Sequence, residues 1–154
     1  MIRHRIPALI ATLAATSLSS AFAFAQGTSD KVASAQSQVL LKADHSWNGV
    51  PYTHYPKGRP ELTMLKLTIA PHTKLPWHTH PFPNAGYVLS GALTVHDKVS
   101  GKTRVFHQGE AFAETVNDIH RGETGDEPAV LLVTYSGTPG VPTSIPVKGQ
   151  QKEY

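Results

Sequence analysis

Three histidines are spaced so that they could bind one metal ion. His78 and His80 lie two residues apart in the segment WHTH, and side chains at i and i+2 of a β-strand point to the same side. A third histidine, His120, follows Asn117 and Asp118, where a turn could deliver it from a neighbouring strand. An HxH pair alone is a weak signal, because a chance or core pair would account for it equally well.

Cysteine is absent from the chain, so a metal site must use nitrogen and oxygen donors. Such a donor set suits one divalent transition metal, namely Mn, Fe, Ni, Cu or Zn. The sequence contains no glycine-rich phosphate loop or dinucleotide pattern, and spacing supports no Ser-His-Asp triad. Metal binding is therefore the leading chemistry.

Short strands separated by turns are expected to position these histidines. Apolar residues fall in short runs between Gly, Pro, Asn and Asp, which favours strands over long amphipathic helices. The predicted fold is an all-β sandwich or barrel, with the aromatic, Pro-rich loop 45–60 covering part of it. The strands are expected at 39–41, 62–70, 77–80, 85–90, 92–97, 103–107, 110–114, 119–123 and 129–135.

Two stretches around the histidines resemble the paired motifs of the cupin superfamily. They are HTHPFPNAGYVLSG at 78–91 and GEAFAETVNDIHRG at 109–122, and the resemblance covers roughly 62–135. It implies a double-stranded β-barrel of jelly-roll type with a metal inside near one end. Cupins include dioxygenases, isomerases, decarboxylases, sugar binders and storage proteins, so the resemblance defines the fold better than the activity.

The match assigns His78, His80 and His120 to the metal-binding histidines of these motifs, whereas Asn84 replaces the usual metal-binding Glu. Three neutral imidazoles leave the full +2 charge on the ion, which favours an anionic ligand. An amide oxygen is a weak ligand for transition metals, so Asn84 either ligates the ion or contacts substrate or water.

Glu114 is the rival source of a carboxylate. Alternation along GEAFAE places Glu114 on the same face as Phe112, so if Phe112 packs inside, Glu114 does too. A buried Glu114 could ligate the metal, orient a histidine or act as a general base. The alternative is a solvated strand end with Glu114 as an ordinary surface acid.

The first residues are expected to be an export signal. Arg3 and Arg5 give a basic start, an apolar stretch follows, and Ala23-Phe24-Ala25 offers a cleavage site. The expected organisation is a signal peptide at 1–25, a flexible lead-in at 26–37, a cupin barrel at 38–136 and a Pro/Gly-rich tail at 137–154. The mature protein is then expected to be periplasmic or secreted.

Removal of the signal also makes the chain nearly neutral. Lys plus Arg falls from 14 to 12 against 11 Asp plus Glu, a net charge of +1, so neither nucleic acid nor a membrane is an expected partner. A small-molecule ligand is expected, and a homodimer is left open beside the monomer. The favoured hypothesis is a metal-dependent enzyme of dioxygenase or isomerase type that acts on a small, anionic, oxygenated molecule, with Glu114 handling protons. The alternative is a non-catalytic module that binds a metal or a small molecule.

Overall fold

The structure is a computed structural model that describes residues 35–152. The predicted signal peptide, 1–25, and most of the lead-in lie outside these residues, so both stay predictions. Within the described part, no helix is long and apolar enough to cross a membrane.

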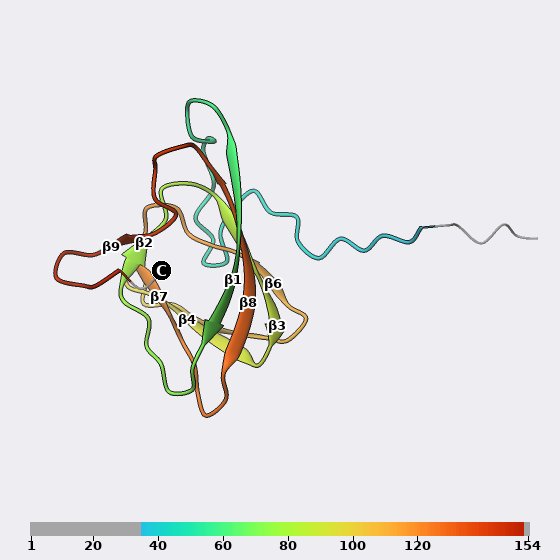
Figure 1. Cartoon of the computed structure of the whole chain (residues 1–154), viewed down its shortest axis with the longest axis vertical. Helices are drawn as coiled ribbons and strands as arrows, with labels where there is room; N and C mark the ends of the chain where they lie inside the picture. Colours follow the sequence, from blue (N-terminus) through green and yellow to red (C-terminus); the bar gives the residue numbers. More distant parts are fainter. Residues whose placement is uncertain (1–34, 153–154) are drawn as a thin grey trace, which may run out of the picture. The chain divides into compact units, whose positions relative to one another are not determined.

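Two antiparallel sheets make up the domain (Figure 1). One sheet has the order β1-β8-β3-β6 and the other has the order β5-β4-β7-β2-β9. The strands of residues 35–152 are β1 (Glu61–Ile69), β2 (His78–Thr79), β3 (Asn84–Ser90), β4 (Ala92–Asp97), β5 (Thr103–His107), β6 (Ala111–Ala113), β7 (His120–Glu123), β8 (Ala129–Gly137) and β9 (Ile145–Pro146).

Alternation along the strands builds a single core between the sheets. In β8 every second residue is buried, and Leu131 and Tyr135 are each 1% exposed. The rings of Phe106 and Phe112 stack with centroids 4.2 Å apart, which joins β5 of one sheet to β6 of the other. The inward residues of both sheets form one apolar cluster. The predicted all-β jelly-roll fold is confirmed, although no strand pairing closes the two sheets of the described part into a continuous barrel.

Two expectations about the ends of the domain were wrong. Residues 39–41 form no strand, because Val39 and Leu40 are 77% and 54% exposed and the segment pairs with no other strand of the described part. The segment expected to be a tail is partly ordered into the fold, since β8 continues to Gly137 and β9 pairs with β2. β9 contains Pro146, which a sheet tolerates at an edge, where its missing N–H is not needed.

Candidate metal centre

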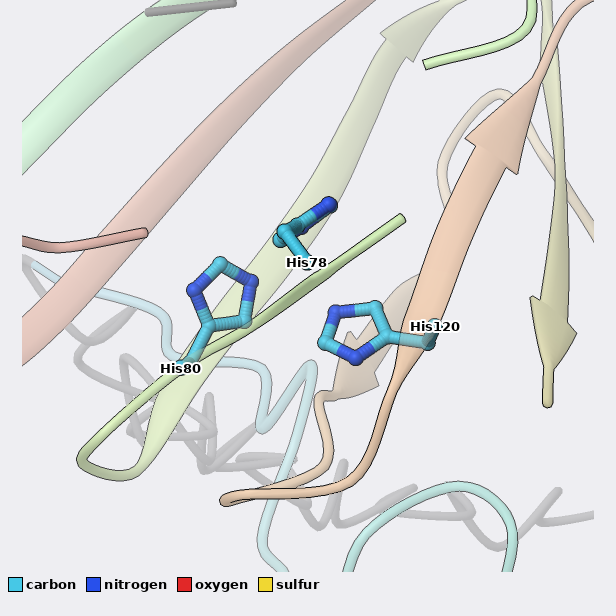
Figure 2. A group of neighbouring side chains, drawn as sticks. All are labelled: His78, His80 and His120. Atoms are coloured by element: carbon cyan, nitrogen blue, oxygen red, sulfur yellow. The ribbon is translucent and has the colours of Figure 1, made fainter. Parts of the chain in front are cut away.

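The structure brings His78, His80 and His120 together. His78 in β2 lies opposite His120 in β7, and His80 follows β2 in a bridge to Val116. The ring centroids are 4.6 to 4.9 Å apart, and one ligand atom from each ring lies within 4.8 Å of the other two. Figure 2 shows the three side chains pointing toward one another. All three histidines are buried, with exposures of 6%, 0% and 1%.

Backbone carbonyls hold the outer nitrogen of each ring. The Nδ1 atoms of His78, His80 and His120 lie 2.8, 2.6 and 2.9 Å from the carbonyl oxygens of Pro76, Thr143 and Asp118. A carbonyl can only accept a hydrogen bond, so each Nδ1 carries a proton and donates. In a neutral ring this leaves a lone pair on Nε2, the atom that a metal would bind.

Glu114 is buried beside His80. It follows β6, is 9% exposed, and its Oε2 lies 2.8 Å from His80 Nε2. Phe112 is 2% exposed, so the two side chains are both inside, as alternation predicts, and the surface-acid alternative is wrong. The contact has the distance of a charged pair without the alignment of a hydrogen bond, and neither atom has another hydrogen-bond partner.

Protonation of the site follows from burial and from the charges of its members. Burial, followed by the charges of His120 and His80, lowers the pKa of His78 to about 4. Burial also lowers the pKa of His120, with the charge of His80 adding to the effect against that of Glu114. Both rings are therefore neutral near pH 7 and able to ligate.

His80 and Glu114 behave as a pair. Burial lowers the pKa of His80, but the charge and contact of Glu114 outweigh it and raise the pKa overall. Burial raises the pKa of Glu114, but the charge and contact of His80 bring it down to about 2. The lone pair of His80 Nε2 and the carboxylate oxygen of Glu114 repel each other unless a positive charge lies between them. Either a proton or a metal ion supplies that charge.

The donors fit a transition metal. Around one ion with bonds of about 2.1 Å, neighbouring ligand atoms are roughly 3.0 to 3.4 Å apart, and the 2.8 Å between Glu114 and His80 is close to this spacing. The histidine donors, up to 4.8 Å apart, would need to draw together by about 1 to 2 Å. His80 Nε2 and His120 Nε2 are both buried and have no hydrogen-bond partner.

Asn84 lies on the inward face of β3, next to the segment that carries Glu114. It begins β3 and is 6% exposed, and neither Oδ1 nor Nδ2 has a hydrogen-bond partner. It borders a cavity of about 630 Å³ lined also by Tyr52 and Ala113, whereas His78, His120 and Glu114 border a separate cavity of about 20 Å³. The small cavity has room for about one water molecule. Glu114 borders the small cavity in front of the histidines, and its backbone N–H donates a hydrogen bond of 3.2 Å to the carbonyl of Asn84.

The loop 45–60, which precedes β1, forms hydrogen bonds with the segment that carries Glu114. The Tyr52 hydroxyl donates a hydrogen bond of 2.5 Å to the carbonyl of Glu114, and the Trp47 N–H donates one of 2.9 Å to the carbonyl of Ala113. Burial and the nearby charge of Glu114 raise the pKa of Tyr52 to about 12, so the phenol stays neutral and able to donate. Sequence reasoning missed this contact and that of Thr143, because both involve backbone carbonyls, which leave no sequence signal.

In the described part of the chain, His72 and Asn117 have positive φ without being glycine, at 53° and 62°. Asn adopts positive φ more readily than most residues, so Asn117 fits the turn that delivers His120.

Comparison with known proteins agrees with this architecture. The cupin domain family model matches residues 65–135. Similar solved structures include the DMSP lyase DddQ from Ruegeria pomeroyi DSS-3, with 18% identity and a TM-score of 0.52 over 59% of this chain and 45% of that chain. A chain from the structures of the DMSP lyases RdDddP and RnDddQII has 20% identity and a TM-score of 0.51 over 56% and 44%.

A cupin-like protein from Thermotoga maritima has 16% identity and a TM-score of 0.48 over 56% of this chain and 64% of that chain. The matched region spans less than half the length of either lyase chain, and at this identity the likeness concerns the fold alone. No curated protein sequence matches the chain significantly.

Proposed function

Because this chain belongs to the cupin superfamily, we propose that His78, His80 and His120 hold one divalent transition metal ion, with Glu114 beside it. One observation carries the proposal. The Nε2 atoms of His80 and His120 and the Oε2 atom of Glu114 are buried without hydrogen-bond partners, while the Nδ1 atoms are held by carbonyls. A proton between His80 and Glu114 would satisfy only that pair, whereas a metal ion would satisfy His120 Nε2 as well.

The function that we propose is metal-dependent action on a small, anionic, oxygenated molecule, with a reaction of dioxygenase or isomerase type. A bound divalent metal supplies a Lewis acid and acidifies a coordinated water. Three neutral imidazoles and one carboxylate leave a net charge of +1 on the site, which still favours an anion. Glu114 can hold or release a proton at Oε2, and its burial keeps bulk water away from that proton.

A second candidate is a non-catalytic metal-binding module. The small cavity beside the histidines favours it, because about 20 Å³ leaves no space for an organic substrate without movement of the surrounding chain. The inward position of Glu114 favours catalysis instead, since a purely structural site has no need of a proton-transfer group. Turnover measurements separate the two candidates.

Metal analysis tests the proposal directly. We expect one equivalent of metal in the purified mature protein and none in the double variant His78→Ala/His120→Ala, measured by elemental mass spectrometry. The exposed His107 provides the control, and His107→Ala should retain the metal. Metal at full stoichiometry in the double variant would refute the site. Protein reconstituted with each of Mn, Fe, Ni, Cu and Zn is then screened for turnover of small carboxylates and enols, with and without dioxygen.

Export is the final part of the proposal. We expect cleavage after Ala25 and a periplasmic or secreted product, because of the basic start and the Ala-Phe-Ala site. Intact-mass measurement on protein from the producing cell tests this, and a cytoplasmic product that retains residues 1–25 would contradict it.

A further inference from the structure

The C-terminal segment 143–150 lies along the strand that carries the HxH pair. β9 lies beside β2 (Figure 1), with Pro146 opposite His78 and Ile145 opposite Thr79 in the register of the two strands. Beyond β9, the Val147 N–H donates a hydrogen bond of 2.9 Å to the carbonyl of Trp77. Gln150 Oε1 accepts one of 3.2 Å from the Trp77 N–H. The segment is thus fixed along β2 at both of its ends.

β2 has few other attachments within the described sheet. Its register with β7 consists of the single pair His78 and His120. His80, just beyond β2, is held through an isolated bridge to Val116 and through its carbonyl, which accepts a hydrogen bond from the Asn117 N–H at 2.9 Å. The C-terminal segment therefore supplies much of the pairing of the strand from which His78 and His80 project.

His80 differs from the other two histidines in the origin of its Nδ1 partner. His78 and His120 use carbonyls two residues earlier, and His120 Nδ1 also lies 2.9 Å from Thr115 Oγ1, so the Nδ1 partners of both rings are close in sequence. His80 uses the carbonyl of Thr143, 63 residues away in sequence, at 2.6 Å. This contact keeps the proton on Nδ1 and directs Nε2 toward Glu114. Among the three ligands, His80 alone depends in this way on a remote part of the chain.

We propose that the segment 143–150 is a positioning element of the metal centre, which orients His80 through the carbonyl of Thr143 and supports β2 through β9. This rests on the proposed function in that His80 is taken as a ligand. Loss of a partner that orients a ligating histidine lowers metal affinity by about 10- to 100-fold. The centre is therefore completed by a part of the chain outside the two sequence motifs.

Truncation tests the proposal. A chain that stops after Gly140 should bind Zn²⁺ about 10- to 100-fold more weakly than the full mature chain in a chelator competition titration. A chain that stops after Gln150 keeps every contact described above and should bind like the full chain. In a His80→Ala background, the same truncation after Gly140 should cause a clearly smaller further loss, since only the support of β2, which carries His78, remains to be removed. A truncated protein within about twofold of the full chain would overturn the proposal.

A second pair of variants applies if the truncated chain does not fold. Ile145 is 42% exposed, so its substitution leaves the core intact. Ile145→Pro offers no N–H to its register partner Thr79 and should weaken Zn²⁺ binding, while Ile145→Ala keeps the N–H and should not. Equal Zn²⁺ affinities for these two variants would overturn the proposal.

The Nδ1–H signals of the histidines in NMR of the metal-free protein give a readout that is independent of the metal. We expect truncation or Ile145→Pro to remove the exchange protection of His80 Nδ1–H alone, while His78 and His120 keep theirs. General loosening would affect all three, and that result, or protection of His80 unchanged, would overturn the proposal. If the full chain binds no Zn²⁺, the proposed function fails, whereas these signals still decide whether the segment positions His80.

Discussion

Replacing Glu114 by Gln removes the buried negative charge while keeping the size of the side chain. Oε2 lies 2.8 Å from His80 Nε2, within the separation of two ligands on one ion, so the change should remove or weaken a ligand and reduce metal affinity by about 100-fold. At a Zn²⁺ concentration of about 100 times the wild-type dissociation constant, metal stabilises the wild type by about 2.7 kcal/mol. The same Zn²⁺ concentration equals the dissociation constant of the variant, so metal binding stabilises the variant by only about 0.4 kcal/mol.

These free energies correspond to measurable shifts in melting temperature. For a domain of this size, with roughly 4 °C per kcal/mol, Zn²⁺ should raise the Tm of the wild type by about 11 °C and that of the variant by about 2 °C. Without metal, the variant should also be less stable than the wild type near pH 7, because Glu114→Gln removes the carboxylate that pairs with a protonated His80 Nε2. Scanning calorimetry with and without Zn²⁺ measures both effects.

The exposed Glu61 provides a matched control, since Glu61→Gln removes one charge from β1, at the opposite edge of the sheet from β6, and should leave the Zn²⁺ shift unchanged. Equal Zn²⁺ shifts for Glu114→Gln and the wild type would refute a ligand role for Glu114. If turnover then fell while metal content stayed full, the carboxylate would act as a base and not as a ligand.

Three further substitutions test the surroundings of the site. Gly86→Ala would place Cβ 2.4 Å from Phe112 Cζ, so we expect a loss of about 1 to 3 kcal/mol in denaturant unfolding, which Phe112→Leu should partly restore. Tyr52→Phe removes the hydrogen bond to the carbonyl of Glu114 and should cost about 1 kcal/mol by the same assay, while Tyr55→Phe, at a residue 73% exposed, should cost nothing measurable. Asn84→Ala should leave metal content stoichiometric by elemental analysis, because the carboxylate of Glu114 lies 2.8 Å from His80 Nε2 and an amide is the weaker ligand; loss of metal would make Asn84 a ligand.

The strands could be predicted where one face is buried and where turn residues such as Ser-Gly separate neighbouring strands. Residues 92–97 and 103–107 were predicted as strands and form β4 and β5 with the same bounds, because apolar alternation and Ser-Gly turns specify them locally. β9 was not predictable, since two residues around a proline have no period and depend on β2 for pairing.

For the candidate site, the i, i+2 rule predicted that His78 and His80 share a side, and His120, the predicted third ligand, lies opposite His78 in the structure. The burial of Glu114 stayed open at the sequence level, because one strand does not reveal which elements cover its end. The carbonyl of Thr143 could not be predicted at all, since every residue has a carbonyl and only the fold selects one.

Because the cavity beside the histidines is small, ligand binding should depend on the fraction of molecules in which the site is open. About 20 Å³ admits one water, so a larger molecule would reach a metal ion held by the histidines only in conformers in which the chain around the cavity has moved aside. The apparent dissociation constant is then the intrinsic constant divided by the fraction of open molecules. If one molecule in about a hundred is open, binding is about a hundredfold weaker than the contacts alone would give. A substitution that increases the fraction of open molecules, at a residue that contacts neither the ion nor the ligand, should therefore tighten ligand binding.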